Sequence, residues 1–219
     1  VTINGTNDAP VIDNTTLTGS GAEDGLVTGT VTAGDIDNPQ SELTFSLDTS
    51  DGATVAANGT VTVNADGSYS YTPEANFNGT DSFTVQVADG DGGFDTEVVN
   101  ITIAPVNDVA TITGDASEDV FEDGSLSTGG TLTVNDVDAG ENVFQAATAE
   151  GAHGNFAMAT DGTWTYTGTD SDAIQALGVN DTIVEKFTVT SEDGTATETI
   201  EVTINGTNDA PVIDNTTLT

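Results

Sequence analysis

Apolar and polar residues alternate over short stretches along the whole 219-residue chain. Clear examples are residues 27–31, 43–47 and 83–87, where Val, Leu or Phe alternates with Thr, Ser, Gly or Gln. A period of two predicts β-strands with one buried face, because successive side chains of a strand point to opposite sides. Turn residues recur about every eight to twelve positions, the spacing typical of an all-β sandwich.

The alternation also predicts which side chains are buried. In the stretch at residues 82–87 we expect Phe83, Val85 and Val87 to face inward and Ser82, Thr84 and Gln86 to face outward. The last strand of the same domain is expected to bury Val99, Ile101 and Ile103. About seven such strands are predicted between residues 9 and 106.

Two pairs of residues are predicted to form hairpin turns. Asn58-Gly59 would connect residues 54–55 to residues 60–63, and Asp66-Gly67 would lead into the strand at residues 69–71. Asn-Gly and Asp-Gly favour such turns because both residues readily adopt positive φ angles.

An Asn-Asp pair marks three boundaries, at Asn7-Asp8, Asn107-Asp108 and Asn208-Asp209. The pairs are spaced by about 100 residues, the length of one small sandwich. We therefore expect the end of a preceding repeat at residues 1–8, sandwich domains at 9–106 and 107–207, and the start of a further repeat at 208–219. Residues 1–18 recur unchanged as residues 202–219, which indicates a longer tandem array.

The second domain differs from the first by an insertion at residues 170–181. Ser171 or Asp172 is placed to cap a short helix through Ala173, Ile174 and Leu177, with Gly178 ending it. The two domains are therefore expected to be related without being copies.

The charge balance is extreme, with 37 acidic residues, one basic residue and a net charge of −36. Nucleic acid and anionic membrane surfaces are excluded as partners, because both require clustered Lys and Arg. No apolar run reaches the roughly 18 residues of a membrane span, so direct membrane insertion is not expected. The charge fits either a disordered chain or a folded protein whose carboxylates bind metal ions, and the strand pattern favours the second.

Three further acidic motifs occur at matching places in both domains. They are Glu23-Asp24-Gly25 and Glu122-Asp123-Gly124 after the first strand, Asp35-Ile36-Asp37 and Asp136-Val137-Asp138 after the second, and Asp89-Gly90-Asp91-Gly92 and Glu192-Asp193-Gly194 before the last. If strands alternate in direction, the second and third motifs lie at one pole of a domain, and the first lies at the other. The junction between the domains then gathers Glu23, Asp24, Asn107, Asp108, Asp136, Asp138 and Asp193.

Carboxylate and amide oxygens in this number favour Ca²⁺, which takes six to eight oxygen ligands at about 2.3–2.6 Å. One His and no Cys disfavour Zn²⁺ and Cu²⁺. Six or more carboxylates provide ligands for about two to three ions. Without metal, two carboxylates about 4 Å apart repel by about 1–4 kcal/mol. The sequence therefore predicts a hinge that is loose without calcium and rigid with it. The alternative is that these motifs are ordinary solvated turns, since Asp-Gly and Asn-Asp are common turn formers.

The motifs also carry a resemblance to a known family. The first domain resembles the cadherin-like tandem repeats of giant bacterial surface adhesins through DGSYSYTPEANFNGTDSFTVQVADGDGG and APVND. The second is similar to a VCBS repeat of the same RTX-type proteins through SEDVFEDGSLSTGGTLTVNDVDAGE, DAIQALGVNDTIVEKFTVTSEDG and GTNDAP. The resemblance implies two tandem Ig-like or cadherin-like seven-stranded β-sandwich domains joined by a short calcium-binding linker. It also implies type I secretion to the bacterial surface and a role as an extender in cell adhesion and biofilm formation.

The resemblance assigns calcium ligands residue by residue. At the central junction they are Asn107, Asp108, Glu23, Asp24, Asp136 and Asp138. The outer half-sites are Asn7, Asp8, Asp35, Asp37, Asp89 and Asp91 at one end, and Glu122, Asp123, Asn208 and Asp209 at the other. The partners implied are neighbouring repeats of the same chain, and weak self-association between arrays is left open.

The remaining chemistry-bearing residues indicate no catalysis. His153 has no recognisable partner, and Lys186, the only Lys or Arg, is expected in a surface charge pair. Trp164 and Tyr166 alternate on a strand and are expected in the core. We therefore expect a non-catalytic extender. The alternatives are a glycan- or protein-binding module, which would need these aromatic residues exposed, and an accessory domain of a large secreted enzyme.

Overall fold

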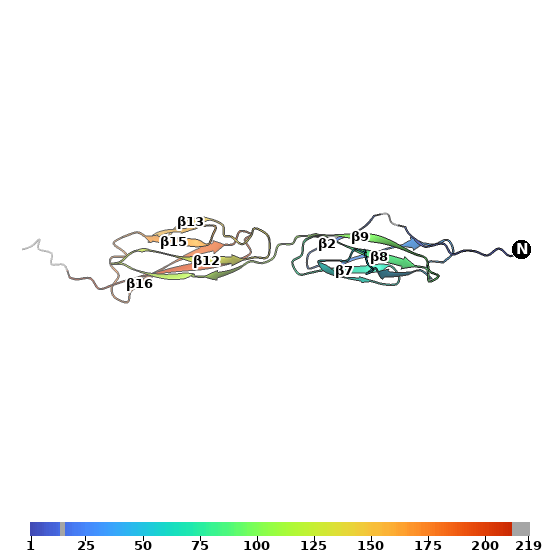
Figure 1. Ribbon diagram of the computed structural model, residues 1–219. Coiled ribbons are helices and arrows are strands. Elements are labelled where there is room, and N and C mark those ends of the chain that lie inside the picture. The colour runs from blue at the N-terminus through green and yellow to red at the C-terminus, as the bar shows by residue number, and fades with distance from the viewer. Residues whose placement is uncertain (14–15, 212–219) are drawn as a thin grey trace, which may run out of the picture. The chain divides into compact units, whose positions relative to one another are not determined.

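The computed structural model describes residues 1–13 and 16–211. The chain divides into two compact units, Val1–Val106 (unit 1) and Asn107–Thr219 (unit 2). Each is a β-sandwich, and the described residues include no helix (Figure 1). The predicted fold class, all-β with two tandem β-sandwiches, is confirmed.

Unit 1 is built from two main sheets and a short ribbon. Its described strands are β1 (Val11–Ile12), β2 (Leu17–Ala22), β3 (Val27–Thr30), β4 (Ala33–Gly34), β5 (Thr44–Leu47), β6 (Gly59–Val63), β7 (Ser68–Pro73), β8 (Gly79–Ala88) and β9 (Phe94–Ala104). One sheet has the order β2-β9-β8-β5, the other β3-β7-β6, and β1 pairs with β4. The first strand of the larger sheet, β2, runs parallel to the last, β9, and the other neighbours are antiparallel.

The core of unit 1 lies between the two main sheets. Phe83, Val85 and Val87 on β8 are fully buried, and so are Val99, Ile101 and Ile103 on β9, as predicted. Tyr69 on β7 contacts Phe83 edge to face, with ring centroids 5.4 Å apart. Burying these apolar faces is the main contribution to the stability of the sandwich.

Thr84 does not point into solvent as predicted but is buried. The segment after β5 crosses over it: the Thr54 N–H donates to the Thr84 hydroxyl at 2.9 Å, and the Thr84 N–H donates to the Thr54 carbonyl. Alternation along a strand identifies the core face, but it does not show which loops cover the other face.

Of the two predicted turns, one is confirmed and one is wrong. Gly67 turns the chain between β6 and β7 with a positive φ of 84°. Residues 54–57 form no strand, so Asn58-Gly59 is not a hairpin turn, and Gly59 begins β6. Gly59 does not adopt a positive φ. It is required because a Cβ there would lie 2.5 Å from the Tyr71 ring.

Unit 2 has the same plan with a different division of strands. The described strands are β10 (Thr111–Gly114), β11 (Ser117–Phe121), β12 (Ser127–Asn135), β13 (Ala147–Glu150), β14 (Gly154–Met158), β15 (Thr163–Gly168), β16 (Thr182–Thr190) and β17 (Thr197–Asn205). They form a five-stranded sheet, β10-β12-β15-β14-β13, and a three-stranded sheet, β11-β17-β16. As in unit 1, the first strand of the second sheet, β11, is parallel to the last, β17.

One strand changes sheets between the units. In unit 1, β5 pairs with β8, whereas in unit 2 the strand at this point of the chain, β13, pairs with β14 in the opposite sheet. A remnant of the first arrangement persists in the isolated bridge between Phe144 and Ser191. The segment therefore starts against one sheet at Phe144 and ends as the β13 edge of the other.

The predicted helix at residues 170–181 is wrong, since the segment forms consecutive turns. A single helical i→i+4 bond is made by the Gln175 N–H to the Ser171 carbonyl, while Ile174 and Leu177 donate three residues back. So short a segment does not repay helix nucleation, and the fully buried Ile174 side chain fixes it to the core instead.

Trp164 and Tyr166 on β15 are fully buried in the core of unit 2, as predicted. Phe156 stacks on Phe187 at 4.7 Å between ring centroids and an interplanar angle of 9°. The Trp164 indole N–H donates to the Asp115 carbonyl at 2.9 Å, so the buried ring leaves no polar atom unpaired.

Candidate metal centres at the poles of each unit

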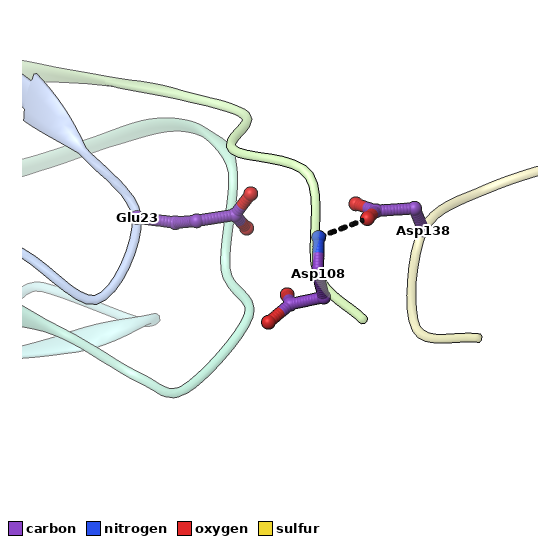
Figure 2. Close-up of side chains that lie close together, drawn as sticks. All are labelled: Glu23, Asp108 and Asp138. Carbon is purple, nitrogen blue, oxygen red and sulfur yellow. Dashed lines mark hydrogen bonds between the residues drawn. The ribbon is translucent and has the colours of Figure 1, made fainter. Parts of the chain in front are cut away.

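In unit 2 the acidic linker enters at one pole, which we call the incoming pole. Asn107 and Asp108 form the linker, the Asp136–Asp138 turn follows β12, and Asp193 lies in the turn before β17. The Asp108 N–H donates to Asp138 Oδ2 at 2.7 Å (Figure 2), and Asn107 Nδ2 donates to Asp193 Oδ2 at 3.2 Å. Four of the predicted ligands are thus fixed to one another by hydrogen bonds.

Three carboxylates of this pole form a compact oxygen cluster. One oxygen each from Asp136, Glu141 and Asp193 lies within 4.8 Å of the other two. Asp136 Oδ2 and Glu141 Oε2 are buried and have no hydrogen-bond partner among the described residues. Desolvation and the neighbouring charges of Asp138, Asp136, Asp193 and Glu192 raise the pKa of Glu141 above its ordinary value. A divalent cation would remove this repulsion and supply the missing partner.

The cluster also contains a carboxylate held firmly in its charged form. The Ser191 hydroxyl donates to Asp193 Oδ1, and Thr195 and Asn107 add further hydrogen bonds. These bonds hold the pKa of Asp193 well below its usual range. A ligand fixed as a charged oxygen donor is pre-organised for a hard cation.

Glu141 was not among the predicted ligands. It lies in the turn after Asp136-Val137-Asp138, three residues beyond Asp138. The corresponding acid in unit 1, Glu42, is five residues beyond Asp37, so no repeated spacing marks the position. The available signal was an acidic residue in the same turn, which is weak in a chain this acidic.

The incoming pole of unit 1 has the same hydrogen bonds. Asn7 Nδ2 donates to Asp89 Oδ2 at 2.8 Å, and the Asp8 N–H donates to Asp37 Oδ2 at 2.8 Å. The Asp37 N–H donates to Asp35 Oδ1 at 2.7 Å, as the Asp138 N–H does to Asp136 Oδ1 at 2.9 Å. The Asn7 amide lowers the pKa of Asp89.

Asp35 Oδ2 is buried and has no hydrogen-bond partner among the described residues, as is true of Asp136 Oδ2 in unit 2. The Asp91 carboxylate accepts a long hydrogen bond of 3.4 Å from the Asn38 amide. Within the described residues of unit 1 alone, no three carboxylates gather as they do in unit 2.

The outgoing poles, where the chain leaves each unit, are also built alike. Glu23 at the end of β2 accepts the Val106 N–H, and Glu122 after β11 accepts the Thr207 N–H. Both carboxylates are 4% exposed, and Glu122 Oε2 has no partner. Figure 2 shows Glu23 extending from the β2 end of unit 1. In each unit a buried glutamate therefore binds the backbone just beyond the last strand.

Asp24 and Asp123 lie beside these glutamates. Asp24 has a positive φ of 57° and accepts the Asn76 N–H at 3.3 Å. Asp123 accepts the Thr207 hydroxyl. Asn78, which the sequence did not single out, donates to Glu23 Oε2 at 3.3 Å, so the loop after β7 reaches the outgoing pole of unit 1.

The last predicted pair is Asn208-Asp209, at the start of the expected further repeat. Asn208 Nδ2 donates to the Asp209 carbonyl at 3.2 Å, and both residues are exposed. The expected start of a further repeat at 208–219 continues into residues 212–219, which lie outside the described residues.

One family model matches both units, at residues 7–105 and 107–206, and it describes the bacterial cadherin-like domain. The chain belongs to the bacterial cadherin-like family. No curated protein sequence matches it.

Solved cadherin structures share the fold of this cadherin-like pair. A protocadherin GammaB4 extracellular domain is 20% identical with a TM-score of 0.61, over 93% of this chain and 33% of that chain. Drosophila N-cadherin EC1-4 is 18% identical with a TM-score of 0.62, over 92% of this chain and 50% of that one. Mouse cadherin-23 EC22-24 is also 18% identical, with a TM-score of 0.60, over 92% and 67%. The chain thus spans between a third and two-thirds of these structures.

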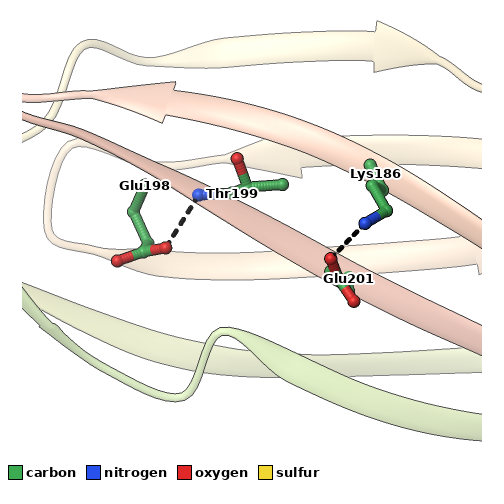
Figure 3. A network of polar contacts seen from close by, with 4 residues as sticks. All are labelled: Lys186, Glu198, Thr199 and Glu201. Atoms are coloured by element: carbon green, nitrogen blue, oxygen red, sulfur yellow. Dashed lines mark hydrogen bonds and ion pairs between the residues drawn. The ribbon is translucent and has the colours of Figure 1, made fainter.

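Lys186, Trp164 and Tyr166, which were considered for functions other than metal binding, have structural roles. Lys186 on β16 pairs with Glu201 on the neighbouring β17, on the exposed side of the sheet (Figure 3). The expected surface charge pair is therefore present. Trp164 and Tyr166, the aromatic pair that a glycan-binding surface would have needed, are both inside the core. The described part of this cadherin-like chain contains no apolar helix of membrane-spanning length.

Proposed function

We propose that this chain is a calcium-stiffened extender of a large secreted bacterial surface adhesin. The observation that supports it most is the repetition of one hydrogen-bonded acidic arrangement at corresponding poles of both units. If these motifs were ordinary solvated turns, the same two hydrogen bonds would not be expected in both domains. One joins an Asn side chain to an Asp carboxylate, and the other joins a backbone N–H to an Asp carboxylate. Solvated turns also have no need to bury carboxylate oxygens without partners.

Calcium fits this donor set better than other ions. The incoming poles offer carboxylates and a linker amide, and the outgoing poles offer a buried glutamate. The turns and linkers can flex to the irregular six to eight oxygens at about 2.3–2.6 Å that Ca²⁺ accepts. We propose as ligands in unit 2 Asn107, Asp108, Asp136, Asp138, Glu141 and Asp193, and as the outgoing half-site of unit 1 Glu23 and Asp24.

The two half-sites are adjacent along the chain. Glu23 binds the N–H of Val106, the last residue of unit 1, and Asn107 and Asp108 follow directly. The linker ligands thus follow the residue held by Glu23 within two positions of the sequence. We propose that shared ions neutralise both half-sites and stiffen the linker. The pairs Asn7-Asp8 and Asn208-Asp209 would do the same toward neighbouring repeats.

The finer assignment follows the sequence motifs. We infer that the parent protein is an RTX-type adhesin secreted by a type I route, with a VCBS repeat as its second domain. The extender would project an adhesive tip from the cell in biofilm formation. A binding module is the second candidate, and the burial of Trp164 and Tyr166 removes the aromatic surface it was expected to use.

Small-angle scattering in millimolar calcium and in excess EDTA tests the proposal. A calcium-stiffened linker gives a sharply defined maximum dimension with calcium and a broader distribution after chelation. The double variant D136N/D138N should resemble the chelated state even in calcium. Profiles that superimpose with and without calcium would refute the extender proposal.

A further inference from the structure

The five-stranded sheet of unit 2 is almost free of charge in a chain with a net charge of −36. Its strands β10, β12, β14 and β15 contain no Asp, Glu, Lys or Arg, and β13 carries a single acid, Glu150, at its end. The opposite sheet carries acids on β11, β16 and β17. Two copies of this polyanion repel each other least where the five-stranded sheet meets solvent.

The sheet ends in an exposed edge at β13. Thr148, Ala149 and Glu150 are exposed, and among the described strands β13 pairs only with β14. The strand has neither Pro nor Lys, the residues that commonly protect an edge from pairing. The other edge strand of the sheet, β10, lies between Asp108 and Asp115. These negative charges disfavour pairing of β10 with a second copy of the chain.

The hydrogen-bond pattern shows which backbone groups of β13 are available. The Gly151 N–H donates to the Gly154 carbonyl at 2.7 Å, which makes Gly151 and Gly154 a hydrogen-bonded pair. Because such pairs alternate along an antiparallel ladder, Ala149 is bonded to Phe156 on β14. The N–H and C=O groups of Thr148 and Glu150 then point away from the sheet.

We propose that β13 is a self-association edge at which two copies of this chain pair antiparallel, joining their five-stranded sheets. An antiparallel strand pairs with its own copy about a two-fold axis, so one edge suffices for a closed dimer. With the axis at Ala149, Thr148 of one copy lies opposite Glu150 of the other. The two Glu150 carboxylates are then at opposite ends of the contact and do not repel each other directly.

The proposal does not depend on calcium and stands apart from the extender function. It is tested by analytical ultracentrifugation of the full chain from micromolar to millimolar concentration, in calcium and in EDTA, at low and high NaCl. We expect a dimer that grows with concentration and with salt in both conditions, since salt screens the net charge.

Three variants locate the contact. Thr148→Glu places a carboxylate opposite Glu150 and should lower the association constant at least about tenfold, the equivalent of 1.4 kcal/mol. Thr148→Pro removes the outward N–H, which β14 does not use, and should do the same. Thr199→Glu makes the same charge change on β17 of the other sheet and should leave association unchanged.

The melting temperature of each variant shows whether it is folded. A chain that stays monomeric at every concentration and salt, or a dimer that both Thr148 variants leave intact, would overturn the proposal. A dimer that forms only with calcium would also overturn it, because association would then run through the acidic poles.

Discussion

Segments distant in sequence set the environments of two polar residues, Thr84 and Glu141. Thr84 is covered by Thr54, whose N–H donates to the Thr84 hydroxyl. The Glu141 carboxylate meets those of Asp136 and Asp193, and Asp193 comes from another turn.

Glu141→Gln tests the carboxylate that the sequence did not reveal. Loss of this ligand should weaken calcium binding to unit 2 at least about tenfold, the lower range for outer-shell partners of a metal. In EDTA the same variant should unfold at a slightly higher temperature, because it removes repulsion from Asp136 and Asp193. Calorimetric calcium titration and thermal melting measure the two effects.

Glu198→Gln is the matched control. Glu198 lies on β17, where it accepts the Thr199 N–H (Figure 3), and carries the same charge. If it alters calcium affinity as much as Glu141→Gln does, then Glu141 acts only through the net charge.

Gly67 illustrates a backbone requirement that the sequence did reveal. A Cβ at this position would lie 2.2 Å from the Val31 carbonyl oxygen, and its φ is 84°. Gly67→Ala should therefore destabilise unit 1 by at least about 1–3 kcal/mol. Gly52→Ala has a similar φ of 94° but meets no atom within 4 Å. Denaturant unfolding of both variants separates the clash from the backbone strain, and equal losses would contradict the role of the Val31 contact.

At the scale of elements, a tyrosine and a carboxylate anchor the same loop in both units. Tyr71 on β7 donates to Asp81 on β8 at 2.9 Å, and Asp81 accepts the Ala57 and Asn58 N–H groups. Tyr166 on β15 donates to Glu185 on β16 at 2.7 Å, and Glu185 accepts the His153 N–H. In unit 1 the anchored residues Ala57 and Asn58 follow a segment without strand, whereas in unit 2 the anchored His153 lies in the tight turn between β13 and β14.

The anchor in unit 1 should be sensitive to acid. Burial raises the pKa of Asp81, but the Asn58, Ala57 and Ser82 N–H groups and the Tyr71 hydroxyl outweigh it and lower the pKa overall. A depressed pKa stabilises the fold above the unfolded value of about 3.9, and the contribution is lost as the pH falls through the folded pKa. Asp81→Asn should cost about 1–3 kcal/mol at neutral pH and less near pH 3. Unfolding at both pH values measures the difference, and a constant difference would contradict it.

The change of sheet by β13 could not be predicted from its own residues. Residues 147–150 alternate too briefly to select a partner, and the choice follows from where Phe144 is buried and where β14 begins. Likewise, the apolar residues near Ile174 suited a helix, but only Ile174 is fully buried, and Leu177 packs partly buried against the core. Short elements take their form from the packing around them.

At the scale of the whole molecule, the net charge of −36 makes stability depend on the solvent. In EDTA, added NaCl should raise the melting temperature, because it shortens the screening length to about 10 Å at 0.1 M. With calcium bound at the poles the same salt should have a smaller effect, and the melting temperature should rise with calcium concentration as ligand linkage requires. Scanning calorimetry over a salt and calcium matrix tests this, and a salt response equal in both conditions would contradict it.

The parallel pairing of β2 with β9 and of β11 with β17 determines how these sandwiches respond to tension. β2 pairs with β9 from Leu17 to Ala22, and β11 pairs with β17 from Ser117 to Phe121. A pull on the two chain ends of a unit draws these parallel neighbours in opposite directions along their length. Their hydrogen bonds are then loaded together in shear, whereas an antiparallel hairpin pulled from its open end separates one bond at a time. Each unit therefore resists traction along the chain at its parallel strand pair, while the preceding strands β1 and β10 are held by antiparallel pairing with β4 and β12.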